Sequence, residues 1–133
     1  MSSQTFRNAQ GGLIDRNRPL GFTFDGRRYQ GFAGDTLASA LLASGVRRVA
    51  RSFKYHRPRG VLSFANHDAN VMVTTGERTN VRADVEPLAE GRSYRAVNTY
   101  GGLRFDVARV LQLFSRLLPV GFYYKVFYWP RIM

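Results

Sequence analysis

The chain has no cysteine, little lysine and few acidic residues, and each shortage limits what it can be. Without cysteine, its 133 residues can form no disulfide, no thiolate nucleophile and no cysteine-ligated metal or iron–sulfur centre. Lysine occurs only at Lys54 and Lys125, so arginine carries nearly all of the positive charge. The formal net charge of +11 predicts anionic partners: nucleic acid, nucleotide phosphates, membrane headgroups or an acidic subunit surface.

Long apolar runs are also missing. The first twelve residues, MSSQTFRNAQGG, are polar and lack the apolar core of a signal peptide, and no uninterrupted apolar stretch approaches the length of a membrane span. We therefore expect a cytoplasmic protein. The length allows one domain with an appendage and leaves little room for a second domain.

The order of turns and apolar patterns predicts an α+β domain of the β-grasp type. Residues 1–18 are rich in Gly, Asn and Arg, so we expect a flexible N-terminal arm there. Residues 19–100 are predicted to form the β-grasp domain. Residues 101–133 are predicted to form a C-terminal helix and an aromatic extension that packs on a partner or on a downstream domain.

The first half of the predicted domain is a hairpin followed by a crossing helix. Strands are expected at 20–25 and 27–32, joined by the Asp25-Gly26 turn. Asp35 is the expected N-cap of a helix that ends at Ser44, closed by Gly45. Its buried face is expected to hold Leu37, Ala40 and Leu41.

The second half is predicted to contain short strands and a late helix. The strands are expected at 71–74, 80–85 and 94–99. Asp106 is expected to cap the helix, whose apolar stripe runs from Val107 to Leu118 before Pro119 ends it.

Two ordered motifs, RPLGFTFDGRRYQGFAGDTLASALLASGV and RSFKYHRPRGVLSF, resemble the N-terminal region of the alpha subunit of heterotetrameric sarcosine oxidase and of related amine, opine and hydroxyamino-acid dehydrogenases. The resemblance runs from about Ile14 to Arg131. It implies a β-grasp fold similar to 2Fe-2S ferredoxins, placed before a dinucleotide-binding domain.

Smaller relatives of this module hold a cluster with four cysteines. The resemblance places the first two in the loop from Ser63 to His67, the third near Asn70 and the fourth at Asp84. None of these positions is cysteine here. The sequence therefore resembles a cluster-free branch with a structural or interfacial role.

The resemblance implies a noncatalytic module of a multisubunit flavin-dependent amine oxidase or dehydrogenase. FAD, FMN and NAD are implied for the full complex, and no cofactor is expected on this chain alone, since no G-x-G-x-x-G follows a strand. The expected partners are other subunits or the dinucleotide-binding domain. The chain is expected to be a fragment or a separately encoded small subunit, and not an enzyme on its own.

The basic loop, which we define as residues 51–59, holds the candidate binding residues. Charge-assisted contacts to a flavin or nicotinamide phosphate are one interpretation. Pairing with carboxylates of another subunit or domain, and simple solvation, are the others. The candidate anion or cofactor contacts are Arg51, Lys54, Arg57 and Arg59.

No catalytic or metal-binding set is predicted. His56 has no nucleophile or orienting carboxylate at a recognisable spacing, and His67 with Asp68 makes no convincing metal site. Three further carboxylates, Asp84, Glu86 and Glu90, are expected on strand and turn surfaces.

A small basic nucleic-acid-binding protein is the alternative function. Phe53 and Tyr55 interleave with the basic loop, as in surfaces that follow a phosphate backbone and stack bases. The densest aromatic cluster, however, lies in the segment 122–129, apart from the basic loop, so the sequence shows no single interleaved stripe.

Overall fold

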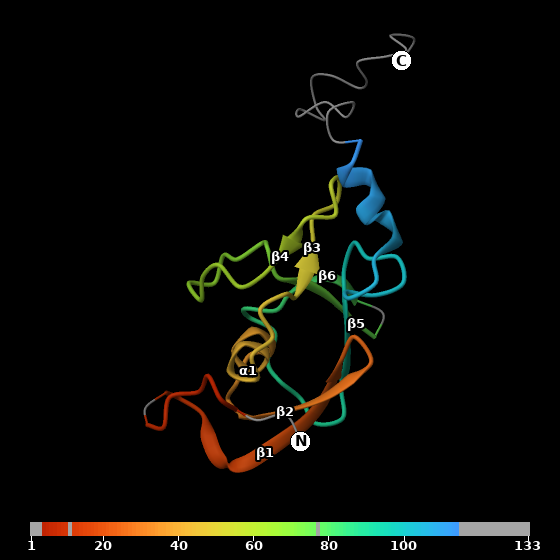
Figure 1. The fold of residues 1–133 in the computed structure, drawn as a ribbon. Helices are drawn as coiled ribbons and strands as arrows, with labels where there is room; N and C mark the ends of the chain where they lie inside the picture. The colour runs from red at the N-terminus through yellow and green to blue at the C-terminus, as the bar shows by residue number, and fades with distance from the viewer. Residues whose placement is uncertain (1–3, 11, 77, 115–133) are drawn as a thin grey trace.

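The computed structural model describes residues 4–10, 12–76 and 78–114 and contains a mixed sheet with one α-helix beside it (Figure 1). In chain order the elements are β1 (Asp15–Phe24), β2 (Arg27–Ala33), α1 (Leu37–Ala43), β3 (Ala50–Arg51), β4 (Pro58–Arg59), β5 (Met72–Thr75), β6 (Arg78–Arg82), β7 (Ser93–Ala96) and the 3-10 helix η1 (Val107–Gln112).

The five-stranded sheet has the order β2-β1-β7-β5-β6. β7 lies in the middle, parallel to β1 and antiparallel to β5, while the other neighbouring pairs are antiparallel. A hairpin, a helix and a late strand that returns beside the first one make this a β-grasp arrangement. The predicted α+β fold is therefore confirmed. β3 and β4 form a separate two-stranded ribbon at the ends of the basic loop.

The β1–β2 turn forms as the sequence predicts. Asp25 and Gly26 both have positive φ, 49° and 78°, and Phe24 pairs with Arg27 across them. Two left-handed residues give the tight turn whose twist matches that of the strands. β1 begins at Asp15, earlier than expected, so it includes the end of the segment predicted as an arm.

The N-cap of α1 is Thr36, and the prediction of Asp35 was wrong by one residue. Thr36 Oγ1 accepts from Ser39 N at 3.3 Å, and Ser39 Oγ accepts from Thr36 N at 3.0 Å, which completes a capping box. Asp35 instead accepts from Phe32 N and pairs with Arg7 at 2.7 Å. Its carboxylate is used to join the N-terminal segment to the end of β2.

Gly45 ends the helix, as predicted. Its φ is +78°, its N–H donates to Leu42 O at 2.9 Å, and Val46 N donates to Leu41 O at 2.9 Å. These two bonds are the Schellman pair that satisfies the last carbonyl groups of a helix. The chain leaves α1 at this point and turns toward β3.

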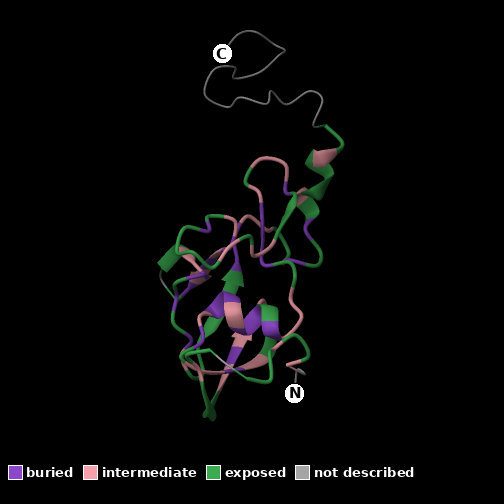
Figure 2. Cartoon of the chain, turned by 90° about the vertical axis from the view of Figure 1, so that its left-hand side faces the viewer, coloured by how far each residue is buried: buried purple, intermediate pink, exposed green. Residues whose placement is uncertain are grey.

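The core lies between α1 and the sheet. The predicted face of α1 is buried, and the helix is largely purple in Figure 2. Phe22 meets Tyr94 edge to face, with ring centroids 6.1 Å apart. The largest fully buried side chains are those of Phe24, Leu37, Leu41, Val49, Val71, Val73, Asp68 and Tyr94. These residues come from both halves of the chain, so the core joins the hairpin to the later strands.

The end of the described chain differs from its prediction. The expected helix is a 3-10 helix over Val107–Gln112, and none of its residues is buried. The rest of the predicted helix and the aromatic extension lie outside the described residues. No helix in the described ranges is both long and apolar enough to cross a membrane.

Adjacent leucines on α1 test the packing. Leu41 is fully buried, whereas Leu42 is 36% exposed. We expect Leu41→Ala to lower the free energy of unfolding by about 2–5 kcal/mol, because it leaves a cavity in the core. Leu42→Ala is the matched control and should cost much less. Urea unfolding measures both, and equal losses would contradict the assigned orientation of the helix.

Candidate functional site

Arg51 is buried beneath the basic loop and uses its guanidinium group inside the fold. It is 3% exposed. Nη1 donates to His56 O at 2.7 Å, Nη2 donates to Leu103 O at 3.2 Å, and Nε lies 3.3 Å from Asp106 Oδ2. The side chain thus joins the basic loop to the segment before η1.

His56 completes this buried cluster. Its Nδ1 lies 2.9 Å from Asp106 Oδ2, and its carbonyl oxygen also accepts from Gln112 Nε2 at 3.0 Å. The backbone of His56 has φ = 50°, a left-handed conformation held by these contacts. His56 therefore has a carboxylate partner that the sequence did not reveal, but the pair is buried and its contacts are structural.

Asp106 carries the negative charge of the cluster. It also caps η1 as predicted, because Oδ1 accepts from Ala108 N at 3.3 Å. Burial acts to raise the pKa of the Asp106 carboxyl, but donation from Tyr100 N and the contacts with His56 and Arg51 outweigh burial and lower the pKa. Asp106 is thus ionised at neutral pH and holds Arg51 and His56 together.

The other candidates of the basic loop lie nearer the surface. The guanidinium group of Arg57 lies 4.8 Å from the ring centroid of Tyr55, and the ammonium of Lys54 lies 5.4 Å from it. Arg59 is exposed and donates to Asn70 Oδ1. Lys54, Arg57 and Arg59 remain predicted anion contacts, whereas the internal contacts of Arg51 give it a positioning role.

The loop expected to correspond to a cluster site folds around Asp68. Its Oδ2 accepts from Leu62 N at 2.6 Å and from Ser63 N at 3.1 Å, and its Oδ1 accepts from Asn70 N at 2.8 Å. Burial acts to raise the pKa of Asp68, but these backbone donations prevail and lower it. A buried carboxylate organises this loop.

Asp84 and Glu86 are buried, so their predicted surface positions were wrong. Asp84 Oδ2 accepts from Asp68 N at 3.1 Å, which brings the strand end against the loop. Glu86 Oε1 pairs with Arg78 at 2.7 Å and Arg92 at 2.9 Å. Arg82 Nε lies 3.4 Å from Asp84 Oδ1, so nearby arginines compensate the charges of both buried carboxylates.

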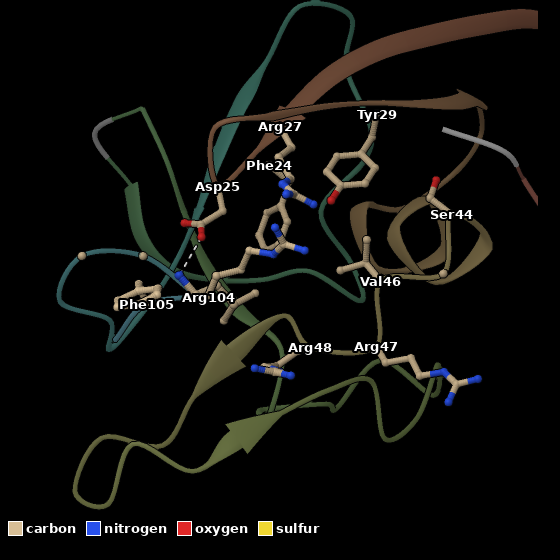
Figure 3. Close-up of a pocket in the computed structure, with 14 residues that line it drawn as sticks. Phe24, Asp25, Arg27, Tyr29, Ser44, Val46, Arg47, Arg48, Arg104 and Phe105 are labelled. Atoms are coloured by element: carbon tan, nitrogen blue, oxygen red, sulfur yellow. Dashed lines mark hydrogen bonds between the residues drawn. The ribbon is translucent and has the colours of Figure 1, made fainter. Parts of the chain in front are cut away.

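A pocket of about 1020 Å³ opens between the β1–β2 turn, the loop after α1 and the loop 101–105 (Figure 3). Among its described lining residues are four arginines, Arg27, Arg47, Arg48 and Arg104, and one carboxylate, Asp25. Sequence reasoning missed this site because its arginines come from separate segments, none of which forms a motif.

A family model described as "2Fe-2S iron-sulfur cluster binding domain" matches residues 17–99. The chain belongs to this family. The match spans β1 to β7, the same region as the β-grasp sheet.

The predicted similarity to sarcosine oxidase alpha subunits is confirmed. The chain is 50% identical over 130 residues to sarcosine oxidase subunit alpha of Rhizobium meliloti (strain 1021), covering 95% of this chain and 13% of that protein. The same subunit of Corynebacterium sp. (strain U-96) is 41% identical over 68 residues, 51% of this chain and 7% of that protein. This chain therefore spans a small part of the length of these relatives.

A solved structure shows the same fold. L-proline dehydrogenase from P. horikoshii matches with a TM-score of 0.55 and 20% identity, over 69% of this chain and 18% of that chain. Identity this low supports the fold and nothing further.

The metal-ligating side chains of this chain do not fit the 2Fe-2S cluster after which the family is named. The chain has no cysteine, and the loop 62–70 is closed by Asp68 accepting backbone N–H groups. The described residues contain no group of three or more His, Asp or Glu side chains arranged for a metal ion. No electron-transfer role through a cysteine-ligated cluster is assigned to the loop 62–70.

Substitution of Asp68 tests the carboxylate-centred loop. Asp68→Asn should lower the free energy of unfolding at neutral pH by about 2 kcal/mol or more, because an amide has one acceptor oxygen where the carboxylate uses two. Since the folded pKa of Asp68 is below 3.8, its stabilisation is complete above pH 3.8 and is lost as the pH falls through the lowered value.

The difference between the natural protein and Asp68→Asn should therefore shrink below pH 3.8. Urea unfolding at a series of pH values measures it, with the exposed Asp15→Asn as control. A difference that stays constant down to strongly acidic pH would contradict this account.

Substitutions of Arg51 and Arg57 compare the contribution of a buried arginine to stability with that of an exposed one. Arg51→Gln should lower the free energy of unfolding by about 3–5 kcal/mol, because it leaves the Asp106 carboxylate buried with one partner fewer. The exposed Arg57→Gln should change it by less than about 1 kcal/mol. Thermal and urea unfolding measure both, and a neutral Arg51→Gln would refute the positioning role.

Proposed function

We propose that this chain is the noncatalytic N-terminal module of a multisubunit, cytoplasmic, flavin-dependent amine oxidase or dehydrogenase of the sarcosine oxidase type. The observation that carries the proposal is the 50% identity to a sarcosine oxidase alpha subunit over 95% of this chain. FAD, FMN and NAD would be bound by other parts of the complex. The role of this module would be to assemble subunits or domains.

The burial of the histidine–carboxylate pair in the described part of the chain supports a noncatalytic role. His56 and Asp106 form the one described histidine–carboxylate ion pair, but both side chains are buried and Arg51 occupies the same carboxylate. A general base must be within hydrogen-bonding reach of a substrate proton. This pair is instead directed into the fold, where it supports the basic loop.

An apolar surface around η1 supports the assembly role. We define the η1 surface by exposed side chains of Phe105, Val107, Val110, Leu113 and Phe114, of which Phe105 is 85% and Leu113 is 80% exposed. Contiguous exposed apolar side chains mark sites where another protein surface packs. We assign this surface to the contact with another subunit or with the dinucleotide-binding domain.

The basic loop lies beside the η1 surface and supplies the polar part of the interface. His56 O and Gln112 Nε2 bond at 3.0 Å, so the loop and η1 are held next to each other. Arg57 and Arg59 are exposed there. An apolar centre with arginines around it is a common composition of protein interfaces. In this proposal Lys54, Arg57 and Arg59 pair with partner carboxylates or reach a cofactor phosphate.

Copurification tests the function. The complete coding sequence is expressed with the subunits encoded beside it, and a tag on this chain is used for purification. We expect a flavoprotein, recognised by its visible absorbance, to copurify. Purification of this protein without any flavoprotein, from a gene that encodes no dinucleotide domain, would refute the proposed function. Salt-dependent binding to mixed oligonucleotides would then favour a nucleic-acid-binding role.

A pair of leucine variants tests the η1 surface. Leu113→Glu should weaken the association with the flavoprotein about tenfold or more, since it places a charge in an apolar contact. Leu62→Glu is the matched control, because Leu62 is also largely exposed, at 77%, but lies in the loop before β5. Where the partner is a domain of the same chain, limited proteolysis replaces copurification as the readout. Equal effects of the two variants would contradict the assignment of the contact to η1.

A further inference from the structure

The pocket lined by Arg27, Arg47, Arg48 and Arg104, which we call the arginine pocket, is a second feature of the molecule. It shares Phe105 with the η1 surface, and its described lining residues include none of the basic loop. Its walls are the β1–β2 turn, the segment that follows α1 and the loop 101–105 (Figure 3). These three segments are far apart in sequence and are brought together by the fold. Each contributes at least one arginine.

The positive charge of the pocket is uncompensated in the described part of the chain. Arg27, Arg48 and Arg104 are exposed, and none of them takes part in the ion pairs found among the described residues. Asp25 is the one acidic residue among the described lining residues, and its Oδ2 already accepts from Leu103 N at 2.7 Å. A concave surface with charge of one sign raises the local concentration of oppositely charged ligands.

The fold fixes the loop that carries Arg104. Leu103 is anchored on both sides: its N–H donates to Asp25 at 2.7 Å, and its carbonyl oxygen accepts from the buried Arg51 at 3.2 Å. Figure 3 shows Arg104 and Arg27 directed toward the same space near the Tyr29 hydroxyl, whereas Arg47 points away from it. Arg27 and Arg104 are therefore placed to act on one ligand.

The chemistry of the lining selects a phosphorylated ligand. Guanidinium groups donate in pairs to phosphate oxygens, and such charge-assisted bonds are stronger than neutral ones. Tyr29 and Phe105 add aromatic surface at the edge of the same pocket. The volume, about 1020 Å³, is at the upper end of the range for small-molecule sites.

We propose that this pocket binds a phosphorylated small molecule that carries at least two phosphate groups, as nucleoside diphosphates and dinucleotides do. Three guanidinium groups around one recess match a compact, multiply charged ligand better than a peptide, whose carboxylates are spread along a chain. The proposal does not depend on the assembly role. The buried Arg51, the first of the candidate contacts in the basic loop, does not touch the ligand in this proposal. It positions the pocket wall by donating to Leu103 O.

Calorimetric titration with inorganic pyrophosphate at low ionic strength tests the site, using the full chain. We expect pyrophosphate to bind the natural protein. In the double variant Arg27→Gln/Arg104→Gln the affinity for pyrophosphate should fall by a factor of about ten or more. The matched control, Arg28→Gln/Arg95→Gln, removes two exposed charges that do not line the pocket and should change the affinity by about twofold at most. Thermal unfolding verifies that the variants are folded, and the single variant Arg48→Gln provides a second test.

Three results would overturn the proposal. The first is no binding of pyrophosphate to the natural protein. The second is an equal loss of affinity in the double variant and its matched control, which would indicate a diffuse charge effect. The third is binding of poly-glutamate, lost in Arg27→Gln/Arg104→Gln, without binding of pyrophosphate, which would assign the pocket to an acidic protein segment. None of these measurements depends on copurification of a flavoprotein, so this proposal and the proposed function can fail separately.

Discussion

The guanidinium group of Arg51 is the contact on which the outer half of this molecule depends. It bonds to the carbonyl oxygens of His56 and Leu103 and lies against the Asp106 carboxylate. These three partners belong to the basic loop, to the wall of the arginine pocket and to the cap of η1. One buried cation therefore sets the relative positions of all the surfaces to which we assign a function. Such a group is costly to desolvate, and its partners must all be present for the burial to be tolerated.

The sequence predicted the parts of the fold that local chemistry decides. The Asp25-Gly26 turn, the Gly45 helix end and the buried face of α1 were each signalled by residues within one turn of the feature. The N-cap was misplaced because Asp35 and Thr36 are both good capping residues. Thr36 accepts from the helix backbone, whereas the Asp35 carboxylate accepts from Phe32 N and Ser39 Oγ and pairs with Arg7. Arg7 and Asp35 are separated by 28 residues, a contact that no local pattern records.

The candidate site was harder to predict for the same physical reason. The motif RSFKYHRPRG showed a cluster of charges but not which of them point inward. Arg51 is separated by 52 residues from Leu103, so its burial depends on tertiary structure alone. The pocket arginines are equally scattered. By contrast, the lack of a cluster followed directly from composition, and the structure adds what replaces it: the Asp68 carboxylate gathers the backbone N–H groups of the loop.

The central position of β7 has a consequence for how the molecule is made. β1 and β7 are joined by the pairing of Phe24 with Tyr94, and β5 reaches the sheet only through β7. During synthesis the hairpin and α1 emerge first, but the inner edge of β1 stays uncovered until residues 93–96 follow. Non-local pairing of this kind slows folding, and an uncovered strand edge is open to pairing with other chains. The nascent chain thus passes through a stage in which it has a helix and a hairpin but no complete sheet.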